Sequence, residues 1–525
     1  MLRSLLSTTR VGKPLDPALA AEAAGELAGA TTWQPYPQSI AAAGHVVFFL
    51  GRRGAEKRAC LVWRSASQPA AVADFSGEQG RAEISGIRIA FLAGPLDHTN
   101  AAGLRKHLPF TAPGVVGVEA AIGTGDRLGI ATPAHVRAVR GSGLRAVFAQ
   151  QSIREMTRTW RTPEEVLDSA TFGVFQEGYR EGFGADADHL KTTDDVDATV
   201  AAGFTMYTVD PGDHVDDEAQ TAGLDALRAK LDALPWPALE TTAEDLRRTY
   251  LGRALRLPDD SEVTLDEESL LRAAAKYGRA LAHTAAMYRH LSERMGPKVF
   301  DLEVSVDETE TPTSAAEHVF IASELLRLGV RWVSLAPRFV GEFEKGVDYI
   351  GDLREFERSF AQHAAVARHF GPYKMSIHSG SDKFSIYPIA ARLSAGLVHL
   401  KTAGTSYLEA LRALAAIDPS LFREILAFAI EHYPSDRASY HVSARLEAVP
   451  RPESLSDEEL AGVLDQFHAR QVLHVTFGSV LTAQAGGRPR FRDRLLRALS
   501  DNEEVHYETV RAHIARHVAP FSQAG

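Results

Sequence analysis

The tetrapeptide His-Leu-Lys-Thr occurs twice in the sequence, at 189–192 and at 399–402. Each copy ends a strand-like segment, so its histidine and its lysine, two residues apart, share one face of the expected strand. Such an imidazole can bind a metal or a substrate while the neighbouring ammonium neutralises an anion. Coincidence, with both side chains pointing into solvent, is the competing explanation, and a second copy at a second strand end weakens it.

Carboxylates and a further histidine stand at comparable places. Asp188, with Asp186, directly precedes the first copy, and Glu303 lies on one face of a largely apolar segment. A carboxylate in such a segment is either a functional group with a perturbed pKa or the partner of a structural cation. His378 ends another strand-like segment, and the Gly/Ser turn after it has backbone N–H groups that can cradle an anion.

Neutral imidazoles and carboxylates suit a divalent cation such as Zn²⁺, Ni²⁺, Co²⁺ or Mn²⁺. We expect His189, His378 and His399, on three strand ends, to converge, although a single histidine is more often a core or surface residue. Cys60 is the only cysteine in the sequence. A thiolate cluster and an intramolecular disulfide are therefore excluded, and a reducing compartment is indicated.

Two arginines, Arg127 and Arg338, follow other strand-like segments, the first directly after Asp126. Either guanidinium can bind a substrate carboxylate through two parallel hydrogen bonds, or can belong to a structural ion pair. The glycines near them do not form GxGxxG or a Walker A loop. The sequence therefore carries no dinucleotide or P-loop signal.

The elements that must position these residues alternate from about residue 115, in the pattern of βαβ units and a parallel sheet. The expected strands are 116–121, 145–149, 183–190, 204–209, 299–306, 331–336, 373–378 and 397–402. The expected helices are 163–179, 194–202, 314–328, 353–370, 386–395 and 407–416. Eight strands alternating with helices predict an α/β fold, a (β/α)8 TIM-type barrel, with its active site at the carboxyl ends of the strands.

We expect three regions along the chain. Residues 1–114 form a β-rich N-terminal accessory region, with strands at 45–50, 59–63, 71–75 and 87–92. Residues 115–435 form the barrel, with a helical insertion at about 217–291 over one edge. Residues 436–525 form a mainly helical tail, in which 471–477 is a candidate late strand.

Composition narrows the class of protein. The 525 residues carry 57 basic and 68 acidic side chains, a net charge of −11, so the overall basic excess that attracts nucleic acid or anionic lipid is missing. No apolar run has the length of a secretory signal or a membrane span. We expect a cytoplasmic protein that binds a small molecule, without a nucleic-acid or membrane partner, and a homo-oligomer stays open.

Five longer motifs, between about 115 and 480, make the sequence similar to the bacterial tagaturonate epimerases. They lie at 125–129, 185–192, 336–349, 376–384 and 399–405. That family interconverts D-tagaturonate and D-fructuronate with a divalent metal. The resemblance therefore implies a metal-dependent barrel enzyme, an isomerase acting on a six-carbon keto-uronate, while the first hundred residues and the last forty carry no part of it.

The resemblance also implies roles for the strand-end residues. The metal ligands would be His189, His378 and His399, with Glu344 or Asp307 as replacements for the third. Asp188 and Glu303 would form an acid/base pair on the two sides of the substrate. The substrate-binding residues would be Asp126, Arg127, Lys191, Arg338, Ser379, Asp382 and Lys401.

The chemistry of the implied reaction limits its mechanism. In ketose numbering the two keto-uronates differ at C4, which is β to the ketone, so abstraction of an α-proton cannot invert it. A retro-aldol route can invert C4. The C4 hydroxyl proton is removed, the C3–C4 bond breaks to give an aldehyde and an enediolate, and the enediolate adds back to the other face of the aldehyde. Transient oxidation at C4 by a bound nicotinamide is the competing route.

Two other functions remain alternatives. One is a metal-dependent aldolase or a neutral ketose (tagatose/fructose) 4-epimerase on the same scaffold, because retro-aldol cleavage without recombination is aldolase chemistry. The other is a catalytically silent sugar-acid binding protein. The strand-end histidines and carboxylates argue against the silent protein, since binding alone needs no acid/base pair.

Overall fold

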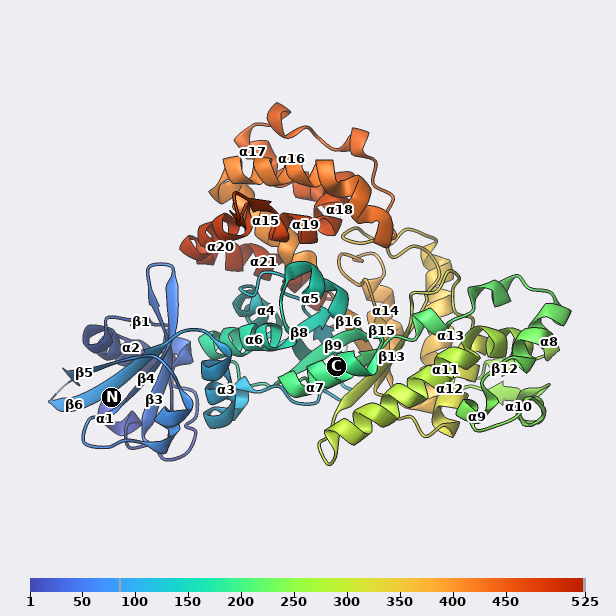
Figure 1. The fold of residues 1–525 in the computed structure, drawn as a ribbon, viewed down its shortest axis with the longest axis horizontal. Helices are drawn as coiled ribbons and strands as arrows, with labels where there is room; N and C mark the ends of the chain where they lie inside the picture. The colour runs from blue at the N-terminus through green and yellow to red at the C-terminus, as the bar shows by residue number, and fades with distance from the viewer. Residues whose placement is uncertain (85, 523–525) are drawn as a thin grey trace.

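A barrel of eight parallel strands lies at the centre of the computed structural model, which describes residues 1–84 and 86–522 (Figure 1). The barrel closes in the order β10-β13-β14-β15-β16-β7-β8-β9. Its strands are β7 (Ala121–Gly123), β8 (Arg145–Ser152), β9 (Phe183–Leu190), β10 (Met206–Val209), β13 (Asp301–Val306), β14 (Ser334–Pro337), β15 (Lys374–Ile377) and β16 (Val398–Lys401). The predicted barrel is confirmed, although its first strand covers Ala121–Gly123 instead of 116–121.

Helices follow the barrel strands and cover the outside of the barrel. They are α4 (Thr132–Val139), α5 (Ile153–Thr159), α6 (Pro163–Glu177), α7 (Thr193–Ala202), α11 (Glu267–Met295), α12 (Ala315–Arg327), α13 (Leu353–Phe370), α14 (Tyr387–Ser394) and α15 (Thr405–Ile417). Capping boxes at Thr162, Thr192 and Ser314 fix the first turns of α6, α7 and α12. Because the barrel strands are all parallel, the loops that follow them lie at one end of the barrel.

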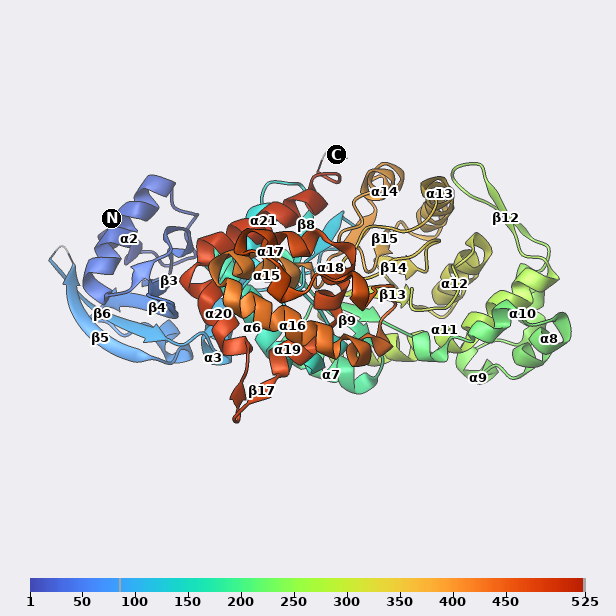
Figure 2. The same ribbon diagram turned by 90° about the horizontal axis from the view of Figure 1, so that it is seen from above.

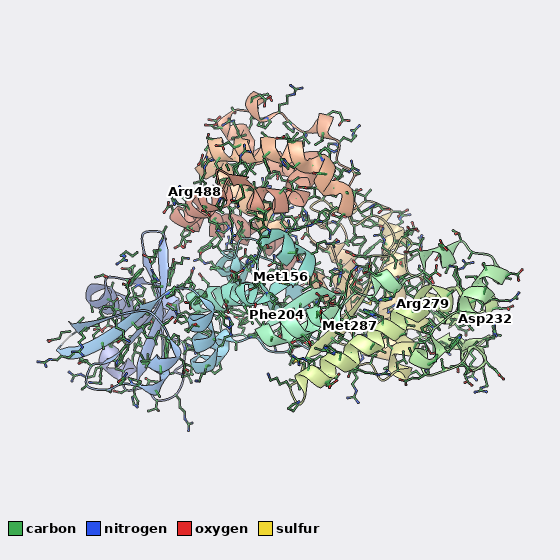
Figure 3. All side chains as sticks on the ribbon, viewed as in Figure 1. Met156, Phe204, Asp232, Arg279, Met287 and Arg488 are labelled. Carbon is green, nitrogen blue, oxygen red and sulfur yellow. The ribbon has the colours of Figure 1, made fainter. Side chains whose placement is uncertain are left out.

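The hydrophobic core lies between the barrel and these helices. Met156, Phe204 and Met287 are buried in it, whereas Asp232 and Arg488 lie near the outer limits of the molecule (Figure 3). None of the helices within 1–84 and 86–522 has a stretch long and apolar enough to cross a bilayer.

The predicted insertion joins β10 to β13 and forms one end of the elongated molecule (Figure 2). It contains α8 (Leu224–Asp232), α9 (Trp236–Leu239), α10 (Ala243–Tyr250) and a hairpin of β11 (Ala254–Arg256) and β12 (Glu262–Thr264), and it leads into α11. The Tyr250 hydroxyl donates to Glu324 of α12 at 2.6 Å, which ties the insertion to the barrel helices.

A six-stranded antiparallel sheet forms the opposite end. Its strands are β1 (Gln34–Pro35), β2 (Ala41–Ala43), β3 (Val46–Arg53), β4 (Glu56–Arg64), β5 (Glu78–Ile84) and β6 (Ile87–Gly94), and α1 (Leu2–Leu5), α2 (Pro17–Thr31) and α3 (His98–His107) accompany it. The expected strand at 71–75 is wrong, because Ala70–Asp74 is a 3₁₀ helix. Val72 and Phe75 lie in the core on one face of the sheet, so this run covers the sheet instead of extending it.

The C-terminal helices form a third lobe beside the barrel (Figure 1). They are α16 (Pro419–Asp436), α17 (Asp457–Leu460), α18 (Phe467–Val475), α19 (Phe477–Thr482) and α20 (Arg492–Asp501), with a small hairpin of β17 (Gln484–Ala485) and β18 (Arg488–Pro489). The last helix, α21 (Glu503–Val518), returns to the barrel, where Val510 and Ile514 lie in the barrel core. The candidate strand at 471–477 is wrong: α18 buries Val472 and Leu473 against other helices of the lobe. A short apolar run has the same composition in a buried strand and in a buried helix, so its pattern did not separate them.

Candidate active site

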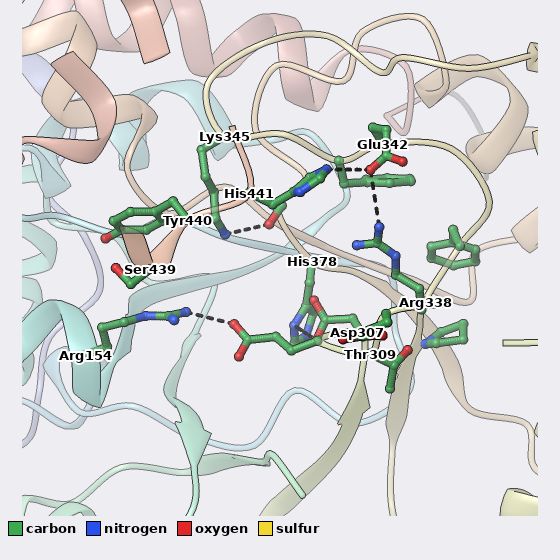
Figure 4. A pocket seen from close by; sticks show the side chains of 16 residues that line it. Arg154, Asp307, Thr309, Arg338, Glu342, Lys345, His378, Ser439, Tyr440 and His441 are labelled. Carbon is green, nitrogen blue, oxygen red and sulfur yellow. Dashed lines mark hydrogen bonds and ion pairs between the residues drawn. The ribbon is translucent and has the colours of Figure 1, made fainter. Parts of the chain in front are cut away.

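Two adjoining hollows lie at the carboxyl ends of the barrel strands. One has a volume of about 460 Å³ (Figure 4) and the other of about 50 Å³. Both are lined by Arg154, Lys345, His378, Ser379 and Tyr440. The two hollows thus form one site between the strand ends and a loop of the C-terminal lobe, which supplies Tyr440.

Asp188, His189 and His378 form a compact group of potential metal ligands at this site. One donor atom from each lies within 4.8 Å of the other two. The ring centroids of the two histidines are 5.0 Å apart. Asp188 and His189 lie at the end of β9, and His378 follows β15 directly, so three non-adjacent side chains meet because both strands end at the same level of the barrel.

Carboxylates orient both imidazoles. Asp210 lies 3.0 Å from Nδ1 of His189, and Nε2 of the same ring lies 3.8 Å from Asp188. His378 contacts Glu303 through Nε2 at 2.6 Å and Asp307 through Nδ1 at 3.2 Å. These contacts fix the orientation of both rings, and at His189 the contact on Nδ1 makes the imidazole a better ligand through Nε2.

A buried ammonium lies under this group. Nζ of Lys401 lies 2.8 Å from Asp186, 2.7 Å from Asp188 and 2.7 Å from Glu303. Burial opposes a charged lysine, but the three carboxylates outweigh it and hold the pKa of Lys401 well above its usual value. Lys401 therefore stays charged and links three strands of the barrel interior.

The same charges shift the groups of the ligand cluster. Burial opposes the charged imidazole of His189, but Asp188 and Asp210 outweigh it and raise its pKa to about 10. Burial likewise opposes the charged His378, and Asp307 raises the pKa of that ring to about 9. Burial raises the pKa of Asp188, but Lys401 and the two histidines lower it further than burial raises it. Both imidazoles are therefore protonated at neutral pH while Asp188 is ionised, and a cation would have to displace the proton of each ring nitrogen that it binds.

Glu303 and His399 lie deeper in the barrel than the sequence led us to expect. The Glu303 side chain is fully buried and accepts a hydrogen bond from Ser334, and neither residue lines the two hollows. Nδ1 of His399 lies 3.3 Å from Glu303, and burial lowers the pKa of His399 to about 4. Nε2 of His399 has no hydrogen-bond partner among the described residues.

The predicted carboxylate-binding cations differ in their surroundings. Arg127 lines the smaller hollow, but it pairs with Glu155 at 2.7 Å. Its guanidinium also lies 3.6 Å from the centre of the Phe477 ring. Lys191 pairs with Asp213 at 2.8 Å and lines neither hollow.

Arg338 lines the larger hollow and pairs with Glu342 at 3.3 Å. Asp126 accepts three backbone N–H groups, from Leu128, Gly129 and Ala131, so its carboxylate shapes the loop after β7. This contact set places Asp126 in a structural turn beside the site.

Asp382 and Glu344 join the barrel loops to the C-terminal helices. Asp382 contacts Arg470 at 3.0 Å and His513 at 2.5 Å. Glu344 accepts hydrogen bonds from Ser443 and Gln471, at 2.7 and 2.6 Å. Both carboxylates therefore help to hold the loops after β14 and β15 in place around the site.

The sequence reasoning missed several residues of the site, among them Lys345, Arg154, Tyr440 and Gln150. Lys345 lies inside one of the five motifs, and this was a signal that could have identified it. Tyr440 and Arg154 carry no such signal, since they come from segments whose approach to the strand ends depends on the packing of the C-terminal lobe and of α5.

Comparisons with known proteins agree with this architecture. The sequence model of the tagaturonate epimerase family (UxaE) matches residues 36–521, which includes much of the two ends that the motifs left out. The chain is 44% identical over 486 residues to the tagaturonate/fructuronate epimerase of Thermotoga maritima, which covers 93% of this chain and 96% of that protein.

Solved structures agree as well. Crystal structures of the fructuronate-tagaturonate epimerase UxaE from Cohnella laeviribosi, native and with one glycerol, superpose with a TM-score of 0.87 at 38% identity. Each covers 96% of this chain and 99% of its own. The expected isomerase class is confirmed by these matches. Because the likeness spans nearly the whole sequence and the whole fold, the chain belongs to the tagaturonate epimerase family.

Proposed function

We propose that this protein interconverts D-tagaturonate and D-fructuronate by inverting C4. Family membership supports the substrate pair. The observation that carries the proposal is the convergence of Asp188, His189 and His378 on one site at the carboxyl ends of the barrel strands. A site of that kind, open to a hollow of about 460 Å³, suits a small polyhydroxy acid.

A divalent cation, of the class of Zn²⁺, Ni²⁺, Co²⁺ or Mn²⁺, fits the three side chains. His189 has its Nδ1 engaged by Asp210 and its Nε2 on the side of Asp188, as a metal-ligating imidazole requires. His378 and Asp188 would complete the set, whereas His399 lies outside it. When bound there, the cation would polarise the ketone oxygen of the substrate and offset the negative charge that develops during reaction.

The acid/base work falls to carboxylates that face the hollow. Asp307 lines the larger hollow and lies 3.2 Å from Nδ1 of His378. We assign to Asp307 the removal of the C4 hydroxyl proton, after which the C3–C4 bond breaks and its electrons pass to C3. Return of the same proton to the C4 oxygen after re-addition closes the cycle.

Glu303 acts as a positioning residue in this scheme. It is fully buried and contacts His378 at 2.6 Å and Lys401 at 2.7 Å. Its carboxylate therefore sets the orientation of His378 and the charge balance under the site, and it does not reach the substrate itself.

The first experiment removes and restores the metal. The purified protein is treated with a chelator, each of the four cations is added back, and D-tagaturonate is followed by NMR in D₂O. Formation of fructuronate only after metal is restored supports the proposal. Turnover of D-tagatose without turnover of the uronate, or release of three-carbon fragments, would support the neutral ketose epimerase or the aldolase instead.

Two variants distinguish the metal ligand, Asp188, from the base, Asp307. Asp188→Asn is expected to lower the metal content, measured by elemental analysis. Asp307→Asn is expected to keep the metal and to lower kcat by about 100-fold or more. Equal metal content in both variants would contradict the assignment of Asp188 as a ligand.

The retro-aldol route predicts exchange of the three-carbon half of the substrate. Labelled tartronate semialdehyde, added during turnover, is expected to appear in both keto-uronates. Absence of exchange, together with a nicotinamide cofactor in the protein released on denaturation, would establish transient oxidation at C4 instead.

A further inference from the structure

Five lysine and arginine side chains line the two hollows: Arg127, Arg154, Arg338, Lys345 and Lys401. Four of them already face a carboxylate of the protein. Their partners are Glu155 for Arg127 at 2.7 Å, Glu308 for Arg154 at 2.8 Å, Glu342 for Arg338 at 3.3 Å, and Asp186, Asp188 and Glu303 for Lys401. Their charges are therefore largely neutralised before a substrate arrives.

Lys345 is different. Among the residues that the structure describes, it has no ion-pair partner, and Nζ donates one hydrogen bond, to Oγ of Ser379 at 2.6 Å. It lines both hollows, and Figure 4 shows its side chain beside Tyr440, pointing into the site. An ammonium with two donors left, in a half-buried position, attracts an anion.

The backbone around Lys345 is fixed on both sides. Nζ of Lys383 donates to the carbonyl oxygens of Glu344 and Val347, at 2.8 and 2.5 Å. Nε of Arg470 donates to the carbonyl oxygen of Gly346 at 2.7 Å. The loop therefore presents Lys345 in one place, and little ordering is needed when a ligand binds.

We propose that Lys345 binds the C6 carboxylate of the substrate, with the Ser379 hydroxyl beside it, and so selects a uronate over a neutral ketose. The assignment rests on the proposed function for the identity of the substrate. A neutral ketose has a CH₂OH group at C6, which gives an ammonium a weaker, uncharged hydrogen bond. Among the five cations of the hollows, Lys345 alone has no carboxylate at ion-pair distance, and the substrate carboxylate supplies one.

The test compares Lys345→Met with the wild type on two ligands that differ at C6, D-tagaturonate and D-tagatose. The conservative Lys345→Arg keeps the charge, and Lys106→Met is the matched control, since Lys106 is exposed on α3 and pairs with Asp74. Dissociation constants are measured by calorimetry and kcat and KM by NMR, with thermal unfolding to confirm that each variant is folded.

For Lys345→Met we expect a loss of about 100-fold in affinity and in kcat/KM for the uronate, mainly through KM. For D-tagatose we expect a change of less than about threefold, and Lys345→Arg is expected to recover part of the uronate affinity. An equal loss on both ligands, or no loss on the uronate, would overturn the assignment.

The two proposals fail differently. A wild type that binds the uronate through Lys345 but does not epimerise it would contradict the proposed function and leave the carboxylate site standing. A wild type that epimerises the uronate while Lys345→Met binds it equally well would contradict the carboxylate site alone. A wild type that does not bind the uronate would overturn both.

Discussion

The carboxylate of Asp210 lies 3.0 Å from Nδ1 of His189, so the imidazole presents its other nitrogen, Nε2, to the group formed with Asp188 and His378. A proton on Nδ1 is required by this contact at any pH at which Asp210 is ionised. His189 adopts a φ of 55°, in the left-handed region, which costs roughly 1 kcal/mol or more for a residue with a side chain. The fold thus holds this histidine in an unfavourable conformation and fixes which nitrogen it offers.

Removal of Asp210 is expected to weaken metal binding. Asp210→Ala leaves His189 free to rotate and to change tautomer, so we expect a loss of about 10- to 100-fold in metal affinity, measured by competition with a chromogenic chelator. Asp197→Ala is the matched control, because Asp197 also contacts a histidine, His290, at a distance of 2.8 Å, and this pair lies outside the site. Equal metal affinity in both variants would show that Asp210 does not support the ligand.

Replacement of Lys401 is expected to destabilise the barrel interior. Lys401→Met leaves Asp186, Asp188 and Glu303 buried without their shared cation, and breaking such a buried ion pair costs about 3–5 kcal/mol. Lys230→Met, which removes a partly exposed lysine from Asp216 and Glu218, is expected to cost less than about 1 kcal/mol. Urea unfolding of both variants measures the difference, and similar midpoints would contradict the charged network.

Glu503 of α21 makes the attachment of the N-terminal sheet depend on pH. It contacts Lys57 at 2.8 Å and accepts a hydrogen bond from Tyr36 at 2.7 Å. Burial raises the pKa of Glu503, but Lys57, Tyr36 and Arg52 outweigh it, so the pKa is lowered overall. Burial lowers the pKa of Lys57, which offsets part of the gain from the pair.

A lowered carboxyl pKa stabilises the fold above the unfolded value, near 4.3, and this contribution is lost as the pH falls through the folded pKa. We therefore expect Glu503→Gln to melt at a lower temperature than the wild type at pH 7, with the difference shrinking below about pH 4. Glu508→Gln, an exposed position on the same helix, is the control. A difference in melting temperature that grows in acid would contradict a lowered pKa of Glu503.

Gly404, at the start of α15, is expected to tolerate no side chain. Its φ is 94°, and a Cβ there would lie 2.5 Å from Nε2 of His474 and 2.7 Å from a guanidinium nitrogen of Arg127. Gly396 has a similar φ of 84° with open space around it, so Gly396→Ala measures the backbone strain alone, about 1 kcal/mol. Gly404→Ala is expected to lose more stability than this and to lower kcat/KM; equal unfolding midpoints would show that the loop yields without cost.

The alternation of strands and helices was readable in the sequence because most barrel strands contain a short run of apolar residues and the helices between them have clear starts. Placing His189 and His378 at strand ends followed from that alternation alone, since the carboxyl ends of parallel strands meet at one end of a barrel. The run at 471–477 shows the limit of such reasoning: its apolar residues are buried in α18, and burial alone does not select a strand.

The sequence by itself therefore determined the barrel, the family motifs and the two histidines of the site. Tertiary structure decided which carboxylates reach the site: Asp188 and Asp307 line the hollows while Glu303 lies below them. It also brought Lys345 beside Ser379 and Tyr440. The physical reason is that alternation along a strand tells which face a side chain takes, whereas its depth in the barrel depends on strand stagger and its neighbours depend on how distant loops and helices pack.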